Sequence, residues 1–150
     1  MIELGEINDR QILYIKYDFE TTWFKYFPKG NWLLFAITDR CLPEIFNEIS
    51  RRAVDNDVVY VSSTGQQANS FHQAIDDVIL IRDVENEYHP KWCILTTSHN
   101  DFEEEFWFAI NSAFGETEEI KKIICIDITS TNQVDKLKDL ILKMKTGWIP

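Results

Sequence analysis

The sequence has little of what marks a nucleic-acid-binding or membrane protein. Its 150 residues include 25 acidic and only 15 basic side chains, which gives a formal net charge of −10. Binding to phosphate backbones needs a basic face, so this shortage of positive charge argues against a direct nucleic-acid partner. Its apolar runs are far shorter than the about 20 residues of a membrane helix, and its first residues lack a signal peptide's basic and apolar regions. We therefore expect a cytoplasmic protein without membrane contact.

Cysteine and recognisable catalytic motifs are also scarce. Cys41, Cys93 and Cys125 are widely separated and form no C-x-x-C pair, which argues against a structural zinc site and a disulfide framework. Cys93 and Cys125 lie within apolar runs, so we expect both to be small buried hydrophobes. The sequence contains no G-x-G-x-x-G, Walker loop, G-x-S-x-G or H-E-x-x-H. We therefore expect no metal, no cofactor and no catalytic residue.

What the sequence does contain is a regular alternation of apolar runs and helix-like segments. The runs are typical of strands buried on both faces, and they lie at 32–37, 57–62, 92–97 and 123–128. Each is followed by apolar residues at helical spacing. This pattern predicts one α/β domain over 1–150, with a βαβαβαβα core at 31–145. We expect a three-layer, Rossmann-like or flavodoxin-like sandwich, with helices on both faces of a mostly parallel sheet of four or five strands.

Two segments fit this pattern less well. Residues 1–30 form an N-terminal extension in which Gln11–Tyr17 has the composition of an edge strand. The aromatic segment Phe19–Phe27 either covers an open sheet face or forms an exposed binding patch. The segment Val78–Asp83 either ends the second helix or forms a small extra strand.

Hydroxyl-bearing residues follow the predicted strands, where parallel α/β sheets usually bind ligands. The same residues also suit helix caps, and Asn100 with Glu103 and Ser130 with Gln133 fit capping boxes. Ser62–Gln67 resembles the FMN-phosphate loop of flavodoxins, although its position after the second strand favours a simple turn with a helix cap. His99 is either an acid–base residue or a loop residue that bonds the backbone. The candidate ligand crevice comprises Asp39, Thr64, Gly65, Thr97 and His99.

The negative charge is concentrated in one segment. Residues 76–119 carry twelve acidic and two basic side chains, so their net charge of −10 equals that of the whole chain. Asp101 and Glu103–Glu105 suit the first turn of a helix, where carboxylates meet the positive end of the helix dipole. The other acids have no such local reason. Each one alone is explained by an ordinary solvated surface, but as a group they favour a basic partner, because crowded like charges speed encounter with one. We expect Trp107 or Trp23 to act as an aromatic anchor in the interface. The predicted partner-binding residues are Asp76, Asp77, Asp83, Glu85, Glu87, Glu104, Trp107, Glu116, Glu118 and Glu119.

Residues 31–129 resemble an uncharacterised family of small bacterial α/β proteins, a domain of unknown function. The similarity is carried by three motifs: Phe71-His72-x-x-Ile75-Asp76, Leu95-Thr96-Thr97-x-His99 and Glu104-Glu105-Phe106-Trp107-Phe108. That family implies an α/β fold and no established activity.

In size, acidity and lack of a catalytic motif, the chain also resembles immunity proteins of contact-dependent growth inhibition systems. That resemblance implies a non-enzymatic protein that binds and neutralises a cognate bacterial toxin domain, expected to be a basic nuclease. The alternative is an α/β domain that binds or hydrolyses a small or phosphorylated ligand in the crevice at the strand ends.

Overall fold

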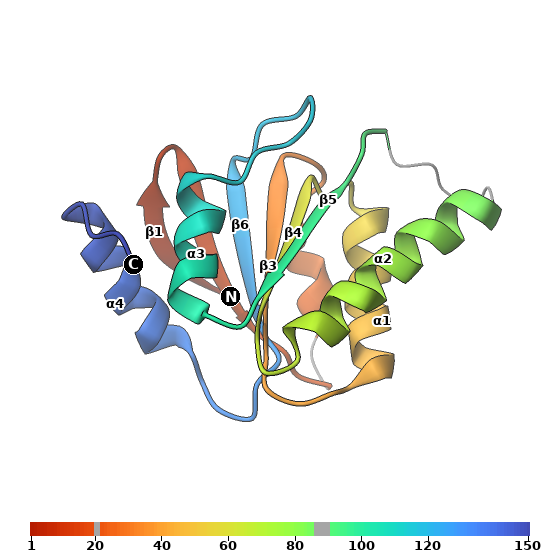
Figure 1. The fold of residues 1–150 in the computed structure, drawn as a ribbon, viewed down its shortest axis with the longest axis horizontal. Coiled ribbons are helices and arrows are strands. Elements are labelled where there is room, and N and C mark those ends of the chain that lie inside the picture. The colour runs from red at the N-terminus through yellow and green to blue at the C-terminus, as the bar shows by residue number, and fades with distance from the viewer. Residues whose placement is uncertain (20–21, 86–90) are drawn as a thin grey trace.

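The computed structural model describes residues 1–19, 22–85 and 91–150. One six-stranded sheet, in the order β1-β2-β6-β3-β4-β5, lies between two layers of helices (Figure 1). The strands are β1 (Ile2–Ile7), β2 (Arg10–Lys16), β3 (Trp32–Thr38), β4 (Tyr60–Gly65), β5 (Leu95–His99) and β6 (Lys122–Asp127). The helices are the 3₁₀-helix η1 (Trp23–Tyr26) and the α-helices α1 (Pro43–Asp55), α2 (Ala68–Glu85), α3 (Phe102–Asn111) and α4 (Val134–Lys145).

The prediction of a mostly parallel α/β sheet is confirmed, but the expected number of strands was too small. Strands β2, β6, β3, β4 and β5 run parallel, and β1 pairs antiparallel with β2. The N-terminal extension supplies two strands because Asn8 and Asp9, both at positive φ, form the tight turn that reverses the chain. The strand predicted near Gln11–Tyr17 exists, but it lies inside the sheet, and β1 takes the edge.

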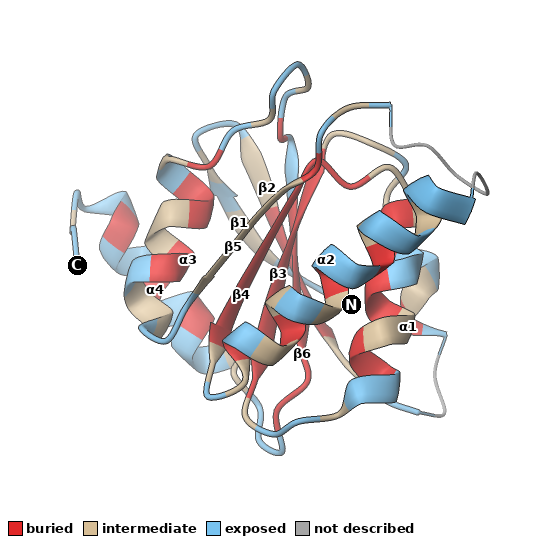
Figure 2. Cartoon of the chain, turned by 45° about the vertical axis from the view of Figure 1, so that its right-hand side comes forward, coloured by how far each residue is buried: buried red, intermediate tan, exposed pale blue. Residues whose placement is uncertain are grey.

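The helices pack on both faces of the sheet and form a separate hydrophobic core on each face (Figure 2). Helices α1 and α2 pack with η1 on one face, where Phe46 and Phe71 are fully covered. Helices α3 and α4 pack on the other face, where Phe35 and Phe106 stack against each other. Strand β3 supplies side chains to both cores, which explains its uninterrupted apolar sequence.

The aromatic segment covers a sheet face, as the simpler of its two interpretations predicted. The side chains of Trp23 and Phe27 are only 3% and 6% exposed, and Phe27 stacks against Trp32 at the start of β3. The proposed role of Trp23 as an exposed anchor is therefore wrong in this structure. Phe19 and Tyr26 remain exposed at its margin.

Other local expectations also needed correction. Val78–Asp83 continues α2 and forms no extra strand. The cap of α3 is Asp101, which accepts a hydrogen bond from the Glu104 amide, and the predicted capping box on Ser130 is replaced by an N-cap at Gln133 without a side-chain capping bond. In the parts of the chain that are described, no helix is both long and apolar enough to span a bilayer.

Cys93 is exposed instead of buried, whereas the prediction for Cys125 is confirmed. The apolar run 92–97 begins before the strand does, because β5 starts only at Leu95. The backbone N–H of Cys93 bonds a side chain, Oε2 of Glu116, at 3.3 Å.

Candidate functional site

The acid-rich segment 76–119 is divided between the two ends of the sheet. Glu103 and Glu104 lie in the first turn of α3, at the carboxyl edge where the parallel strands end. The helix carries the chain back along the sheet, so Glu116, Glu118 and Glu119 lie in the α3–β6 loop at the opposite, amino edge (Figure 1). A single acidic patch that includes all of the predicted residues is therefore absent from the described chain.

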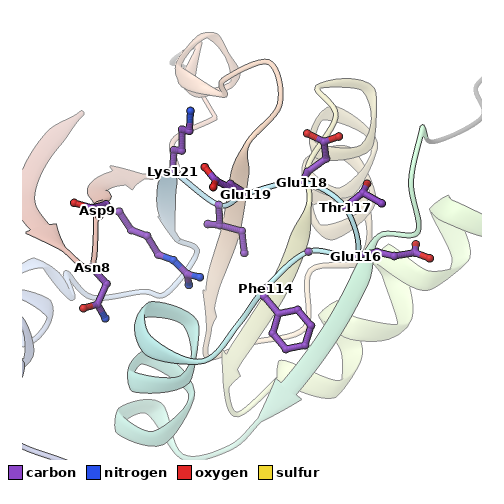
Figure 3. A pocket seen from close by; sticks show the side chains of 11 residues that line it. Asn8, Asp9, Phe114, Glu116, Thr117, Glu118, Glu119 and Lys121 are labelled. Carbon is purple, nitrogen blue, oxygen red and sulfur yellow. The ribbon is translucent and has the colours of Figure 1, made fainter.

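At the amino edge, the acids of the α3–β6 loop surround a cavity of about 550 Å³ (Figure 3). The β1–β2 turn closes its other side with Asp9. Phe114 is also part of the lining, and its side chain is 71% exposed. A large apolar side chain thus lies exposed to water in the lining that also contains the loop carboxylates.

Arg10 also lines this cavity, but its charge serves the fold. Its guanidinium donates to the carbonyl oxygens of Ala109 and Ala113, at 2.7 and 2.5 Å, and so satisfies the C-terminal end of α3. Burial lowers the pKa of Arg10. The lining contains four acidic residues, Asp9, Glu116, Glu118 and Glu119, against the two bases Arg10 and Lys121, so its net charge is negative.

The loop that bears the glutamates is held firmly on the sheet. A Cβ atom at Gly115 would lie 2.4 Å from Val59 Cγ1 and 2.5 Å from the Glu118 carbonyl oxygen, so only glycine allows this close approach. Asn31 donates a side-chain hydrogen bond to the Glu119 carbonyl oxygen at 3.0 Å. The backbone of the loop is therefore held close to the sheet, and the glutamate side chains project from it.

The acids of α2 are exposed, and Asp76 and Asp83 continue this region, whereas Asp77 and Glu85 lie beside residues of α1. Asp76 and Asp77 are in the middle of the helix, and Asp83 and Glu85 follow about two turns later. Asp76 and Asp83 line a second cavity of about 530 Å³ together with Leu80 and Cys93. Since Glu116 bonds the Cys93 backbone, the acids of α2 and of the loop approach each other there.

The remaining predicted partner-binding residues are more scattered. Glu104 belongs to the carboxyl edge, where its Oε2 is 3.4 Å from Nε2 of His99. Trp107 is half-buried on α3 and packs against the second core. Glu87 lies outside the described residues.

The five residues of the candidate ligand crevice share the carboxyl edge. Thr64 and His99 are joined to each other, while Thr97 and Asp39 bond to groups outside the crevice. The Thr64 hydroxyl donates to the His99 carbonyl oxygen at 3.0 Å, and the Thr97 hydroxyl donates to Glu105 at 2.7 Å. Asp39 turns toward β6 and accepts from the backbone N–H and the hydroxyl of Ser130. The polar atoms of this edge thus serve to hold strand ends and loops together.

His99 and Gly65 also have local structural roles. Nδ1 of His99 accepts from the Asp101 backbone N–H at 2.9 Å, which is the backbone-bonding alternative considered for this residue. Gly65 has φ +100°, and a Cβ there would lie 1.8 Å from the Thr38 carbonyl oxygen. The turn after β4 therefore requires glycine.

The sequence interpretation missed the most enclosed polar residue of this edge, Asp127. Its carboxylate is fully buried at the end of β6 and lies 3.3 Å from Nζ of Lys16. It also accepts hydrogen bonds from the Tyr14 hydroxyl, the Gln133 amide, and both the amide and the hydroxyl of Thr129. The one sequence signal was an aspartate inside the otherwise apolar run 123–128.

Asp127 lies at the point where the connections of the sheet diverge. Strand β3 leads into α1 on one face, while its neighbour β6 leads into α4 on the other. Ligands of open α/β sheets often bind at such a point. Here the donors already surrounding the carboxylate make it a structural centre that fixes the β6–α4 loop.

The family comparison agrees with the resemblance seen in the sequence. Residues 12–144 match the model described as Domain of unknown function (DUF7684). The chain belongs to this family. Comparisons with curated proteins and with solved structures gave no match.

The DUF7684 match extends from inside β2 to the last turn of α4. It includes the five parallel strands, the acid-rich segment and the Asp127 centre, while β1 and the β1–β2 turn precede it. Across the described residues of this DUF7684 protein, no group of three or more His, Cys, Asp or Glu side chains is placed to hold a metal ion.

Proposed function

We propose that the protein is a non-enzymatic immunity protein, which binds and neutralises a cognate bacterial toxin domain, a basic nuclease, through its acidic surface. We use "acidic surface" for the region at the amino edge formed by Asp76, Leu80, Asp83, Phe114, Glu116, Glu118 and Glu119. One observation carries the proposal: this region combines several carboxylates with the apolar residues Leu80 and Phe114, which are 61% and 71% exposed.

The two kinds of side chain contribute differently to binding. Carboxylates at the rim of an interface attract a basic partner and raise the association rate, mostly at low salt. Apolar and aromatic side chains that become buried supply most of the affinity. A nuclease domain offers the matching chemistry, since its substrate-binding groove must be basic to accept nucleic acid.

A complex with the toxin domain encoded beside this protein tests the proposal. The triple variant Glu116→Lys/Glu118→Lys/Glu119→Lys should weaken the complex at least about tenfold and reduce its salt dependence. The control Glu103→Lys/Asp135→Lys/Asp139→Lys introduces the same charge change on α3 and α4, outside the acidic surface and without removing the Asp101 cap, and should leave the affinity nearly unchanged. If the purified proteins do not associate at low salt, or if both variants weaken binding equally, the proposal fails.

The alternative, a domain that binds or hydrolyses a small or phosphorylated ligand at the carboxyl edge, rests on the proximity of Thr64, Gly65 and His99. Thermal-shift measurements with nucleotides and flavins test it directly. A rise in melting temperature that is lost in His99→Ala would support this alternative, and an unchanged melting temperature with every ligand would reject it.

A further inference from the structure

The two edges of the sheet differ in how they are protected against further strand pairing. At the β1 edge, the pairing register shifts between Glu3 and Gly5, and the strand carries the acids Glu3 and Glu6. Irregular pairing and charge are common devices that prevent another strand from adding to an edge. The β5 edge has neither: Leu95–His99 pairs with β4 in continuous register and contains no acid, lysine or proline.

Strand β5 is held in place on the face that packs against α2. His72 contacts two of its hydroxyls, with Nε2 at 2.8 Å from Thr96 Oγ1 and Nδ1 at 3.1 Å from Ser98 Oγ. Asp76 accepts a hydrogen bond from Thr96 at 2.9 Å and lies 3.2 Å from the His72 ring. These contacts give the residues of the Phe71–Asp76 motif a structural role: they fasten the outermost parallel strand.

The opposite face of β5 is fastened as well. Thr97 donates to the buried carboxylate of Glu105, which also accepts from Ser62 of β4 at 2.5 Å. Leu95 packs against the second core. Although both of its faces are occupied, most residues of β5 are partly exposed, whereas those of β3 and β4 are almost all buried (Figure 2). In the described chain it has β4 as its one strand neighbour, so the backbone along its outer edge has no strand partner.

The second cavity, of about 530 Å³, lies at the beginning of this free edge. Its apolar lining comes from Ile79 and Leu80 of α2 and from Trp92 and Ile94, which precede the strand. Asp76 and Asp83 add negative charge to its wall. An apolar depression with acidic walls thus continues directly into an unpaired strand edge.

We propose that a partner protein binds here by adding an extended segment to the edge of β5, with one apolar side chain in the second cavity and lysine or arginine beside the acids of α2. This inference rests on the proposed function and specifies where and how the partner binds. Backbone hydrogen bonds along β5 supply affinity, and the cavity and the acids select the sequence. Because β5 is already fixed on both faces, little ordering entropy is lost on binding.

The charge distribution favours a basic partner over a second copy of this chain. Two copies paired through β5 would bring two sets of α2 acids together, since a symmetric interface uses the same patch twice. Repulsion between like charges opposes that arrangement. An extended segment with alternating apolar and basic residues meets the edge, the cavity and the acids together.

Disulfide trapping with short peptides tests the inference without the toxin. Cys93 lines the second cavity and is exposed, Cys41 is exposed beside a different cavity, and Cys125 is buried. The probe is the peptide Cys-Gly-Val-Lys-Val-Lys-Val, together with its reversed sequence so that both strand directions are sampled. Under reversible exchange, the peptide should label Cys93 at least about fivefold more than an analogue with glutamate in place of lysine.

Backbone pairing is tested by N-methylation of the peptide. Along one edge of a strand, only every second residue points its backbone N–H toward the neighbouring strand. We therefore use two analogues, one methylated on the odd-numbered and one on the even-numbered residues. The analogue whose methyl groups block the N–H groups facing β5 should lose the preference for Cys93. Labelling of Cys41 should be the same with every peptide. If Cys93 labels equally with the basic, acidic and both methylated peptides, the inference is overturned.

A matched pair of variants controls for effects on folding. Leu80→Ser should reduce the labelling preference at Cys93, whereas Leu142→Ser on α4, a residue of nearly equal exposure, should not. The outcomes separate the two proposals. If the protein binds the toxin but Cys93 shows no selective labelling, only the proposal of binding at the β5 edge is rejected. If Cys93 is labelled selectively but no toxin complex forms, only the proposed immunity function is rejected.

Discussion

The hydroxyl of Tyr14 donates a 2.6 Å hydrogen bond to the carboxylate of Asp127, which joins the neighbouring strands β2 and β6. Both side chains are almost completely buried. Burial raises the pKa of Tyr14, and the hydrogen bond to Asp127 and the charge of Asp127 raise it further, so the phenol remains a proton donor. A buried carboxylate is tolerated when donors surround it.

Removal of this hydroxyl should therefore destabilise the fold. We expect Tyr14→Phe to lower the free energy of unfolding by about 1–3 kcal/mol, because a buried carboxylate loses a donor that water cannot replace. Urea denaturation measures the change. Tyr26→Phe is the control, since Tyr26 is 48% exposed and its substitution should have almost no effect. Equal stability of both variants and wild type would contradict this role.

Gly65 should tolerate no side chain. In Gly65→Ala the new Cβ would overlap the Thr38 carbonyl oxygen, so the ends of β3 and β4 must separate. We expect a loss of about 3 kcal/mol or more. Gly30→Ala is the matched control, because Gly30 also has positive φ but no atom within 4 Å of the added Cβ, so about 1 kcal/mol is expected. A comparison of the two melting temperatures decides the point.

Asp39 should make stability depend on acid pH. Partial burial raises the pKa of Asp39, but hydrogen bonds from Ser130 and the charges of Arg40 and Lys16 outweigh it, so the net pKa is lowered from 3.8. A lowered pKa means that its contribution is complete above this ordinary value and is lost as the pH falls through the folded-state value.

Unfolding measurements between pH 7 and pH 3 test this pH dependence. We expect Asp39→Ala to be less stable than wild type by about 1 kcal/mol at pH 7, with the difference shrinking in acid. Ser130→Ala should show an intermediate dependence because one of its two donors remains. A difference that stays constant down to pH 3 would exclude this contribution of Asp39.

The three cysteines should differ sharply in reactivity. Burial raises the pKa of the Cys125 thiol, with the nearby charge of Asp127 adding to the shift, whereas Cys41 and Cys93 are exposed. A thiol reagent such as DTNB should therefore modify two cysteines of the native protein, and the third only after unfolding. Rapid modification of all three without denaturant would contradict the burial of Cys125.

Much of the fold could be predicted from the sequence because burial leaves a direct pattern. The run from Trp32 to Ile37 indicated a strand covered on both faces, and the helix spacing that begins at Leu42 located α1. The order of the strands could not be predicted, because apolar periodicity reports that a strand is buried and not which strand lies beside it. The start of β5 was misplaced because Trp92 is apolar but lies outside the strand, where its indole N–H bonds the Val58 carbonyl oxygen.

The candidate site was harder to predict than the fold. The acids between Asp76 and Glu119 are close in sequence, yet α3 separates Glu103 from Glu116 by its own length. Counting charge along the chain cannot show this division. Asp127 escaped notice because a single acid within an apolar run has no motif, and its donors come from Tyr14, Gln133 and Thr129, two of them near in sequence and one far away.

The central position of β6 has a consequence for biosynthesis. This strand comes late in the chain but lies between β2 and β3, which belong to its first third. While the ribosome is still making the preceding segments, β2 and β3 each expose an edge that nothing has filled, and such edges favour aggregation. We therefore expect the nascent chain to complete its sheet only after β6 has emerged from the ribosome.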